Sequence, residues 1–288
     1  MTLLDMQRVL SRILTDKDFQ RSFILGAEPL PDTYQLTESE LRSLRSLRWD
    51  RVGLHADLLA HGRLELALRA LPLTSQLVHQ QLHTHLDRFC TEFPPVPQPA
   101  STLFVEANRL CDFLIRLLGE GALQPGWAAD IVAYERIMLT LVMTVESAMS
   151  AERVASLNAE LSLLEPGWPP ADAADLVPVA GPHAMVASFS YPLPELLPPL
   201  EEGDIPENVA PLERPILLLF HKQPLGSVQM VKVNAPSAAL VEACDGERTV
   251  ADVVGLLDRR FGPGVEAPVL AALGWLCERG VVGLRKGR

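Results

Sequence analysis

A dense run of prolines in the second half of the chain constrains its fold more than any other feature. Twelve of the 24 prolines lie between residues 166 and 215. Because proline lacks the backbone N–H that helix interiors and central strands need, most of this run is expected to be extended. We therefore expect a helical bundle in residues 1–165 and an extended linker in residues 166–182. A second domain is expected in residues 183–288, with an acidic proline-rich loop at residues 192–214.

Residues 1–165 carry the pattern of a helical bundle. Apolar residues recur at spacings of three and four, as in Leu110, Phe113, Leu114 and Leu117, which is the period of one helix face. Thr37 followed by Glu40 forms a capping-box pattern, and it predicts a helix that begins there and runs to about Trp49. A short amphipathic helix is expected over residues 1–14, and further helices over residues 57–70, 74–93, 102–118 and 128–160 are separated by segments with proline or glycine.

Residues 183–288 predict strands first and three short helices afterwards. Stretches rich in β-forming residues and bounded by proline, glycine or asparagine predict strands at 184–191, 215–220 and 227–234. Capping residues and glycine stops predict helices at 235–244, 249–261 and 266–279. Residues 281–284 are expected to return to the sheet. The predicted fold class is therefore α+β, with an all-α bundle followed by a three-stranded antiparallel sheet and three helices.

The charge and composition limit the classes of function. The chain has 288 residues and a net charge of −11, which argues against broad affinity for nucleic acid, because that affinity comes mostly from Lys and Arg. No apolar run is long enough to cross a membrane, and the first residues do not resemble a signal peptide, so we expect a cytoplasmic protein. The four cysteines are scattered singly, which is typical of buried reduced thiols.

A series of short motifs occupies the segment that begins at Val231. They are Val233-Asn234 at a strand end, Asp245-Gly246 in a turn, Arg248-Thr249 at a helix start, Arg260-Phe261 at a helix end, and Arg279-Gly280 before an apolar tail. Their order resembles the PqqD family and the related domains that recognise precursor peptides of ribosomally made, modified natural products. The resemblance implies a winged-helix-like fold whose strand edge receives the leader of a substrate peptide.

An edge strand offers unpaired amides and carbonyls, so an extended leader can add to it as a further strand. Alternate residues of the strand point to opposite faces, so either of two sets can receive the peptide, and the sequence leaves both open. One set is Val228, Met230 and Lys232, and the other is Gln229, Val231 and Val233. One face of the last helix is expected to take part. The candidate peptide-binding residues are Val228, Met230, Val231, Lys232, Val233, Leu270, Leu273 and Leu276.

The first part of the chain carries a second resemblance, over residues 71–191. The runs LPLTSQLVHQQLHTHLDRFCTEFPP, VAYERIM and HAMVASFSYPL resemble the helical partner proteins encoded beside multinuclear non-haem iron oxidases. The resemblance implies a heterodimer in which the TIM-barrel oxidase holds the iron, reworks a cysteine of the precursor, and leaves this chain without a cofactor. Within that class, a helical bundle followed by a recognition domain is the arrangement that we expect of the partner protein in 3-thiaglutamate biosynthesis.

Polar clusters in the bundle are candidates for docking this partner. Arg42, Arg45 and Arg48 form a basic stripe on a predicted amphipathic helix, which is either a solvated face or a docking surface for an acidic partner. His79 and His83 lie one helical turn apart and are expected to form a polar or interface face.

Two rival functions follow from the same features. A winged helix can bind DNA, but the last predicted helix, residues 266–279, offers a single basic residue for contacts with base edges. A metalloenzyme would use His79, His83 and His85, yet no HExxH or neighbouring carboxylate pattern accompanies them. Since glycine-rich phosphate loops, GxSxG elbows and CxxC pairs are also absent from the sequence, we expect no catalytic residue and no metal ligand in this chain.

Overall fold

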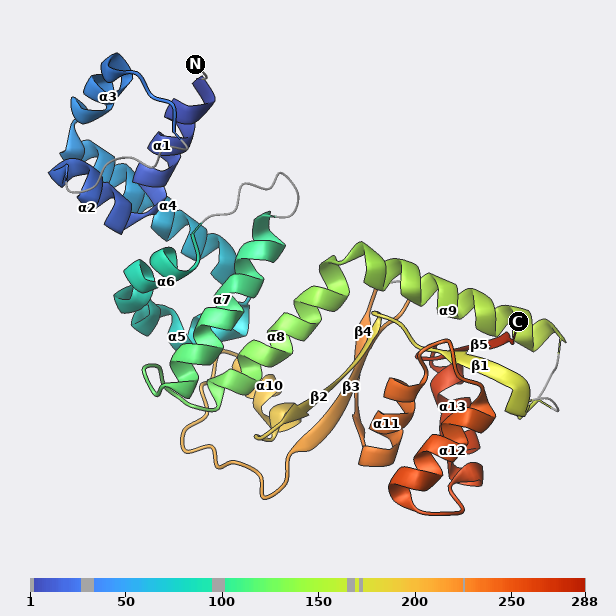
Figure 1. The fold of residues 1–288 in the computed structure, drawn as a ribbon. Helices are drawn as coiled ribbons and strands as arrows, with labels where there is room; N and C mark the ends of the chain where they lie inside the picture. Colours follow the sequence, from blue (N-terminus) through green and yellow to red (C-terminus); the bar gives the residue numbers. More distant parts are fainter. Residues whose placement is uncertain are drawn as a thin grey trace. The chain divides into compact units, whose positions relative to one another are not determined.

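A computed structural model describes residues 3–26, 34–94, 102–164, 169–170, 173–224 and 226–287 (Figure 1). Contacts divide the chain into two compact units, Met1–Val132 and Ala133–Arg288. This division by contacts falls earlier than the domain boundary expected at residue 165, because part of α8 and all of α9 pack within the second unit. The functional boundary at residue 165 stays a prediction.

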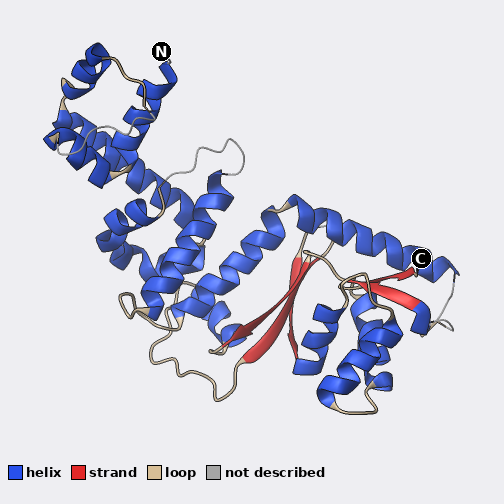
Figure 2. Ribbon diagram, in the orientation of Figure 1, coloured by secondary structure: helices blue, strands red, loops and turns tan. Residues whose placement is uncertain are grey.

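Unit 1 is made of helices, as predicted (Figure 2). They are α1 (Leu3–Thr15), α2 (Lys17–Leu25), α3 (Glu38–Arg45), α4 (Trp49–Arg69), α5 (Pro72–Leu82), the 3-10 turn η1 (His83–His85), α6 (Leu86–Glu92) and α7 (Thr102–Gly119), and α8 (Ala128–Met143) begins in this unit. The predicted capping box is present, since the Thr37 side chain accepts from the backbone N–H of Glu40 and the Glu40 side chain accepts from that of Thr37. Helix α2 was not predicted; its N-terminus is capped by Asp16.

Unit 2 continues with helices and two small sheets (Figure 2). Its elements are α9 (Val145–Leu164), the 3-10 turn η2 (Ala173–Asp175), β1 (Leu176–Val179), β2 (Ala184–Phe189), α10 (Leu193–Glu201), β3 (Ile216–Lys222), β4 (Val228–Val233), α11 (Ala235–Ala243), α12 (Val250–Phe261), α13 (Glu266–Glu278) and β5 (Gly283–Lys286). The three predicted strands and the three C-terminal helices are all present, so the α+β class is confirmed.

The larger sheet is antiparallel, with strand order β2-β3-β4. Leu219 of β3 lies opposite Val186 of β2 and Val231 of β4. Leu219 is fully buried in a core that it shares with residues of α11, α12 and α13, which include Leu240, Leu257 and Leu273. Three helices thus cover one face of the sheet, and the strands hold β4 at its edge.

The proline-rich segments contain more structure than the sequence predicted. Strand β1 lies inside the expected linker, residues 166–182, and pairs with β5 (Figure 1). Pro178 is tolerated there because a two-stranded sheet has only edge strands. Residues 166–168 and 171–172 of the expected linker lie outside the described residues.

The predicted loop at residues 192–214 contains helix α10. Prolines stand in its first turn and also inside it, at Pro198 and Pro199. The helix buries four leucines, Leu193, Leu196, Leu197 and Leu200. Their burial outweighs the backbone hydrogen bonds that the two inner prolines cannot make.

Two further expectations about the sheet and the helices need correction. Residues 281–284 were expected to join the three-stranded sheet, but β5 pairs with β1 in a separate sheet. The helix predicted over residues 128–160 is two helices, since α8 ends at Met143 and α9 begins at Val145. Within the described ranges, every helix is either too short or too polar to span a lipid bilayer.

Candidate functional site

Strand β4 has one edge that no other strand of the described chain occupies, since it pairs only with β3. The turn before it fixes which backbone groups face that edge. Gln223 N–H donates to the Ser227 carbonyl, and Gly226 closes the turn at a φ of 100°. Because antiparallel pairs alternate between hydrogen-bonded and non-hydrogen-bonded, the next pair, Lys222 with Val228, is non-hydrogen-bonded.

Pairing of β3 with β2 leads to the same assignment of hydrogen-bonded and non-hydrogen-bonded residues. The N–H of Lys222 donates to the His183 carbonyl on the side of β2, away from β4. The backbone groups of Val228, and by the period of two those of Met230 and Lys232, therefore point away from β3. These three residues present N–H and C=O groups to an added strand.

The side chains of β4 divide between two surroundings. Met230 and Lys232 lie opposite Phe220 and Leu218 of β3. The Phe220 ring lies 6.0 Å from the ring of Tyr134 in α8. The side chains of Met230 and Lys232 therefore lie on the face of the sheet that carries α8. In the other set, Val233 packs against the core of α11, α12 and α13. The residues of β4 are half-buried or exposed, whereas β3 is buried from Leu218 onward.

An apolar pocket lies just beyond the end of β4. Its volume is about 330 Å³, and Asn234, the residue after β4, forms part of its wall. The remaining wall comes from the three C-terminal helices, through Pro236, Ser237, Leu240, Leu257, Phe261, Val265, Pro268, Val269 and Ala272. An apolar concavity with few polar groups is the usual form of a site that takes one apolar side chain of a ligand.

Two of the three residues predicted on the last helix are buried in the core. Leu273 and Leu276 are both 1% exposed and belong to the core, so they offer no surface to a peptide. Leu270 is half-buried, and its predicted role in peptide binding stays a prediction. Val269 and Ala272 of the same helix line the pocket. Whether a peptide contacts the pocket residues or Leu270 stays a prediction.

Phe261 belongs to a motif that the sequence analysis placed at a helix end, and the structure adds that it lines the pocket. Phe261 is 38% exposed, which is high for a large aromatic residue, and lines the pocket. The Arg260 guanidinium lies 5.3 Å from the centre of its ring. The Arg-Phe ending of α12 thus places an aromatic wall and a positive charge at the site.

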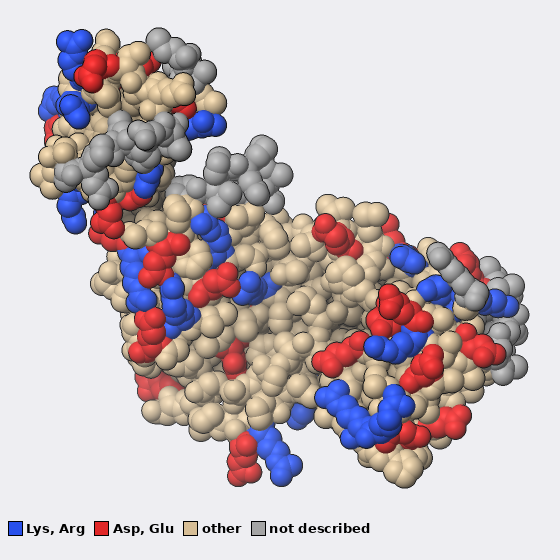
Figure 3. Space-filling view, viewed as in Figure 1, with Lys and Arg blue, Asp and Glu red and all other residues tan. Residues whose placement is uncertain are grey.

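Charges of both signs are interspersed over the part that carries α11, α12 and α13, on the face shown in Figure 3. Helix α13 contains neither Lys nor Arg, as its sequence shows. A helix that reads bases in a DNA groove presents such residues, so the charge pattern does not support the DNA-binding alternative.

The docking candidates of unit 1 occupy two surfaces. Arg42, Arg45 and Arg48 are exposed; the Arg42 side chain donates to the Glu38 carbonyl, and Arg48 pairs with Asp50 at 2.8 Å. Their docking role stays a prediction.

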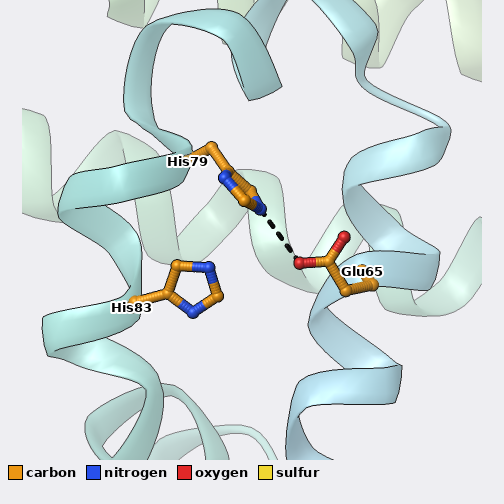
Figure 4. Close-up of side chains that lie close together, drawn as sticks. All are labelled: Glu65, His79 and His83. Carbon is orange, nitrogen blue, oxygen red and sulfur yellow. Dashed lines mark hydrogen bonds and ion pairs between the residues drawn. The ribbon is translucent and has the colours of Figure 1, made fainter.

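His79 and His83 lie together with Glu65 of α4 (Figure 4). Glu65 was absent from every sequence prediction. His85, which the metalloenzyme alternative needs, is not part of this group.

A buried histidine, His183, connects two separate segments of unit 2 through hydrogen bonds. His183 is fully buried; its Nδ1 lies 2.7 Å from Ser150 Oγ in α9, and its Nε2 lies 3.1 Å from the Gly280 carbonyl oxygen. Because a carbonyl only accepts, Nε2 carries the proton and Nδ1 accepts from the serine hydroxyl. Burial lowers the pKa of His183, which matches a neutral ring in the folded state.

Replacing His183 by alanine is expected to destabilise unit 2 by about 2 kcal/mol or more, since the buried partners lose their hydrogen bonds. Urea unfolding at pH 7 measures this change. The lowered pKa means that the unfolded chain binds more protons, so wild-type stability is expected to fall as the pH drops below about 6.5. His183→Ala should reduce this dependence, to which buried His221 also contributes, and the exposed His55→Ala should leave it unchanged. An equal pH dependence in all three proteins would contradict the assignment.

Comparison with known proteins identifies the part of the chain that contains the edge and the pocket. Residues 223–282 match the family model for Coenzyme PQQ synthesis protein D (PqqD). No curated protein sequence matches the chain. The match spans β4, α11, α12 and α13, and it confirms the resemblance predicted from the motifs. Residues 223–282 are therefore PqqD-like, and PqqD domains are non-catalytic accessory domains that bind peptides.

Proposed function

We propose that this chain binds the leader of a ribosomally synthesised precursor peptide along β4 and presents the peptide to a separate modifying enzyme. The observations that carry this proposal are the open edge of β4 and the apolar pocket that begins at Asn234, the residue after β4, both inside the stretch that matches PqqD. The chain supplies binding and position, and the partner supplies the chemistry.

The leader would add to the sheet as a strand next to β4. Its backbone groups would pair with those of Val228, Met230 and Lys232, which face the open edge. Every second leader side chain would then point to the face that carries α11, α12 and α13. Near Asn234 one such side chain would enter the pocket. We infer that the leader carries a large apolar residue at this place.

Positive charge near the pocket suggests that the leader carries an acidic residue next to the apolar residue that enters the pocket, which we call the anchor. Arg260 lies over the ring of Phe261, which lines the pocket, and Lys232 is exposed on β4. An acidic leader residue next to the apolar anchor would meet these positive charges. Such contacts contribute more to partner selection than to affinity.

Presentation works through effective concentration. A leader held on β4 keeps the rest of the precursor near a docked enzyme, so the modification step becomes intramolecular in effect. The partner we propose is a TIM-barrel multinuclear non-haem iron oxidase that modifies a cysteine, as in 3-thiaglutamate biosynthesis, within a cytoplasmic heterodimer. The resemblance over residues 71–191 supports this choice. The iron of this reaction would belong to the oxidase, and this chain would supply no catalytic residue.

The oxidase must dock on a surface that the bound leader peptide does not cover. Arg42, Arg45 and Arg48 offer an exposed positive stripe in unit 1. In unit 2, Val145 and Met149 of α9 are 68% and 65% exposed, and large apolar side chains with this exposure are typical of interfaces. We propose that the oxidase covers at least one of these surfaces.

Co-expression tests the presenting role directly. The tagged chain is produced with the enzymes and the precursor encoded beside its gene, and co-purified proteins are identified together with their metal content. We expect an iron-containing oxidase to co-purify with the chain. We also expect the purified oxidase to convert the precursor at least tenfold faster with the chain than without it. Equal conversion in its absence would overturn the proposal.

A control separates presentation from simple activation of the enzyme. The precursor is supplied in two pieces, so that the free leader and the remaining core peptide are both present but not linked. If tethering is the mechanism, the two pieces are converted much more slowly than the intact precursor. Equal rates for both substrates would indicate that the chain switches the enzyme on by contact alone.

A further inference from the structure

We propose that Glu65, His79 and His83 form a binding site for a late divalent transition-metal ion such as Zn²⁺. The three residues lie in unit 1, on two helical segments that adjoin in the chain. Glu65 belongs to α4, while His79 lies in α5 and His83 directly follows it. One ligand atom from each of the three lies within 4.8 Å of the other two. This inference is independent of the proposed peptide binding.

The contacts between the three side chains bring their donor atoms to one place. His79 Nε2 lies 2.9 Å from Glu65 Oε1, and the rings of His79 and His83 meet edge to face with centroids 4.7 Å apart (Figure 4). Ligands of a tetrahedral ion at about 2.1 Å are roughly 3.4 Å from one another. Small side-chain rotations therefore suffice to place all three donors around one ion, which would replace the proton between His79 and Glu65.

The neighbours of the cluster favour metal binding. His61 stacks on His83 with centroids 5.7 Å apart, and its Nδ1 lies 2.7 Å from the Asp57 carbonyl. The His61 ring is thus held in place and supports His83 from one side. The Glu65 and His79 side chains are 46% and 41% exposed, so an ion can reach them from solvent.

The donor set selects the class of ion. Two imidazole nitrogens and one carboxylate oxygen suit Zn²⁺, Co²⁺, Ni²⁺ or Cu²⁺, whereas Mg²⁺ and Ca²⁺ prefer sites made of oxygen. Since the protein provides three ligands, at least one coordination position is left for water or for a group of a docked protein. The bound ion would clamp α4 to α5 near the turn that joins them.

Titration of the full-length chain with Co²⁺ tests the site, because cobalt reports its coordination by visible absorption. The chain is purified with a tag that contains no histidine and is stripped with a chelator. We expect one equivalent of Co²⁺ to bind with bands typical of four or five ligands, and Zn²⁺ to displace it. Zn²⁺ is also expected to raise the melting temperature of the chain, since it binds the folded state.

Matched variants assign the ligands. His79→Gln and Glu65→Gln are each expected to weaken Co²⁺ binding by at least about tenfold and to remove the Zn²⁺ shift in melting temperature. The control is His55→Ala, which removes an exposed histidine of the same helix α4 outside the cluster and should bind as the wild type does. The chelated variants are compared with chelated wild type by melting temperature to confirm folding. Binding that is absent in the wild type, or equal in the wild type and in the double variant His79→Gln/His83→Gln, overturns the proposal.

Discussion

Replacing Met230 by proline is expected to abolish leader binding while the PqqD-like domain stays folded. Met230 occupies a non-hydrogen-bonded pair with Phe220, so its N–H points to the open edge and takes no part in pairing with β3. Proline removes this donor and places its ring where the leader backbone would approach. We expect affinity for the leader to fall by about 30-fold or more, which corresponds to roughly 2 kcal/mol.

Two matched changes distinguish the backbone from the side chain. Met230→Ala keeps the N–H and is expected to bind the leader within a few-fold of wild type, because the side chain is not buried. Val231→Pro removes an N–H that faces β3, and it should destabilise the sheet itself. Fluorescence anisotropy with a labelled leader measures binding, and urea unfolding measures stability. If Met230→Pro binds as the wild type does, the leader does not pair with β4.

The C-terminal domain was predictable because its signals are local. Asn234, Thr249 and Gly262 each stand at a helix boundary, where capping side chains or a glycine identify the end regardless of distant contacts. The three strands are separated by proline or glycine, and β4 lies directly before its cap. For this reason the order of the elements followed from the sequence, whereas the edge that receives the leader was implied by the resemblance to the PqqD family.

The proline-rich segments were not predictable, because long-range burial decides their structure. Strand β1 forms only because β5 pairs with it, and β5 lies more than a hundred residues later in the chain. Helix α10 forms despite Pro198 and Pro199 because four leucines of its buried face compensate. Proline content predicts the loss of local hydrogen bonds, but it does not reveal the packing that outweighs this loss.

The cluster of Glu65, His79 and His83 was also not predictable, because it forms through packing between two helices. His79 and His83 were visible as a pair one helical turn apart, and the absence of a nearby carboxylate in the sequence argued against a metal site. Glu65 lies fourteen positions before His79 and meets it only because α4 and α5 pack against each other. A ligand set drawn from two helices is invisible to a search for motifs along one segment.

The pocket beside β4 should decide which leaders bind, and filling it tests this. Ala272 lines the pocket from α13, whereas its neighbour Ala271 is exposed and does not. Ala272→Phe is expected to occupy the space intended for the leader's apolar anchor. Since burial of one large apolar side chain contributes about 1.5–3 kcal/mol, the affinity for the leader should fall by roughly 10- to 100-fold.

Ala271→Phe adds the same ring one position away and should leave the affinity unchanged, which separates pocket occupancy from a general effect of a larger residue on α13. The two variants are compared by leader binding and by melting temperature. A leader in which the anchor is shortened to alanine should bind weakly to the wild type and lose little more with Ala272→Phe, because the two changes remove one interaction. Full additivity of the two losses would mean that the anchor lies elsewhere on the domain, and that the edge of β4 binds the leader without help from this pocket.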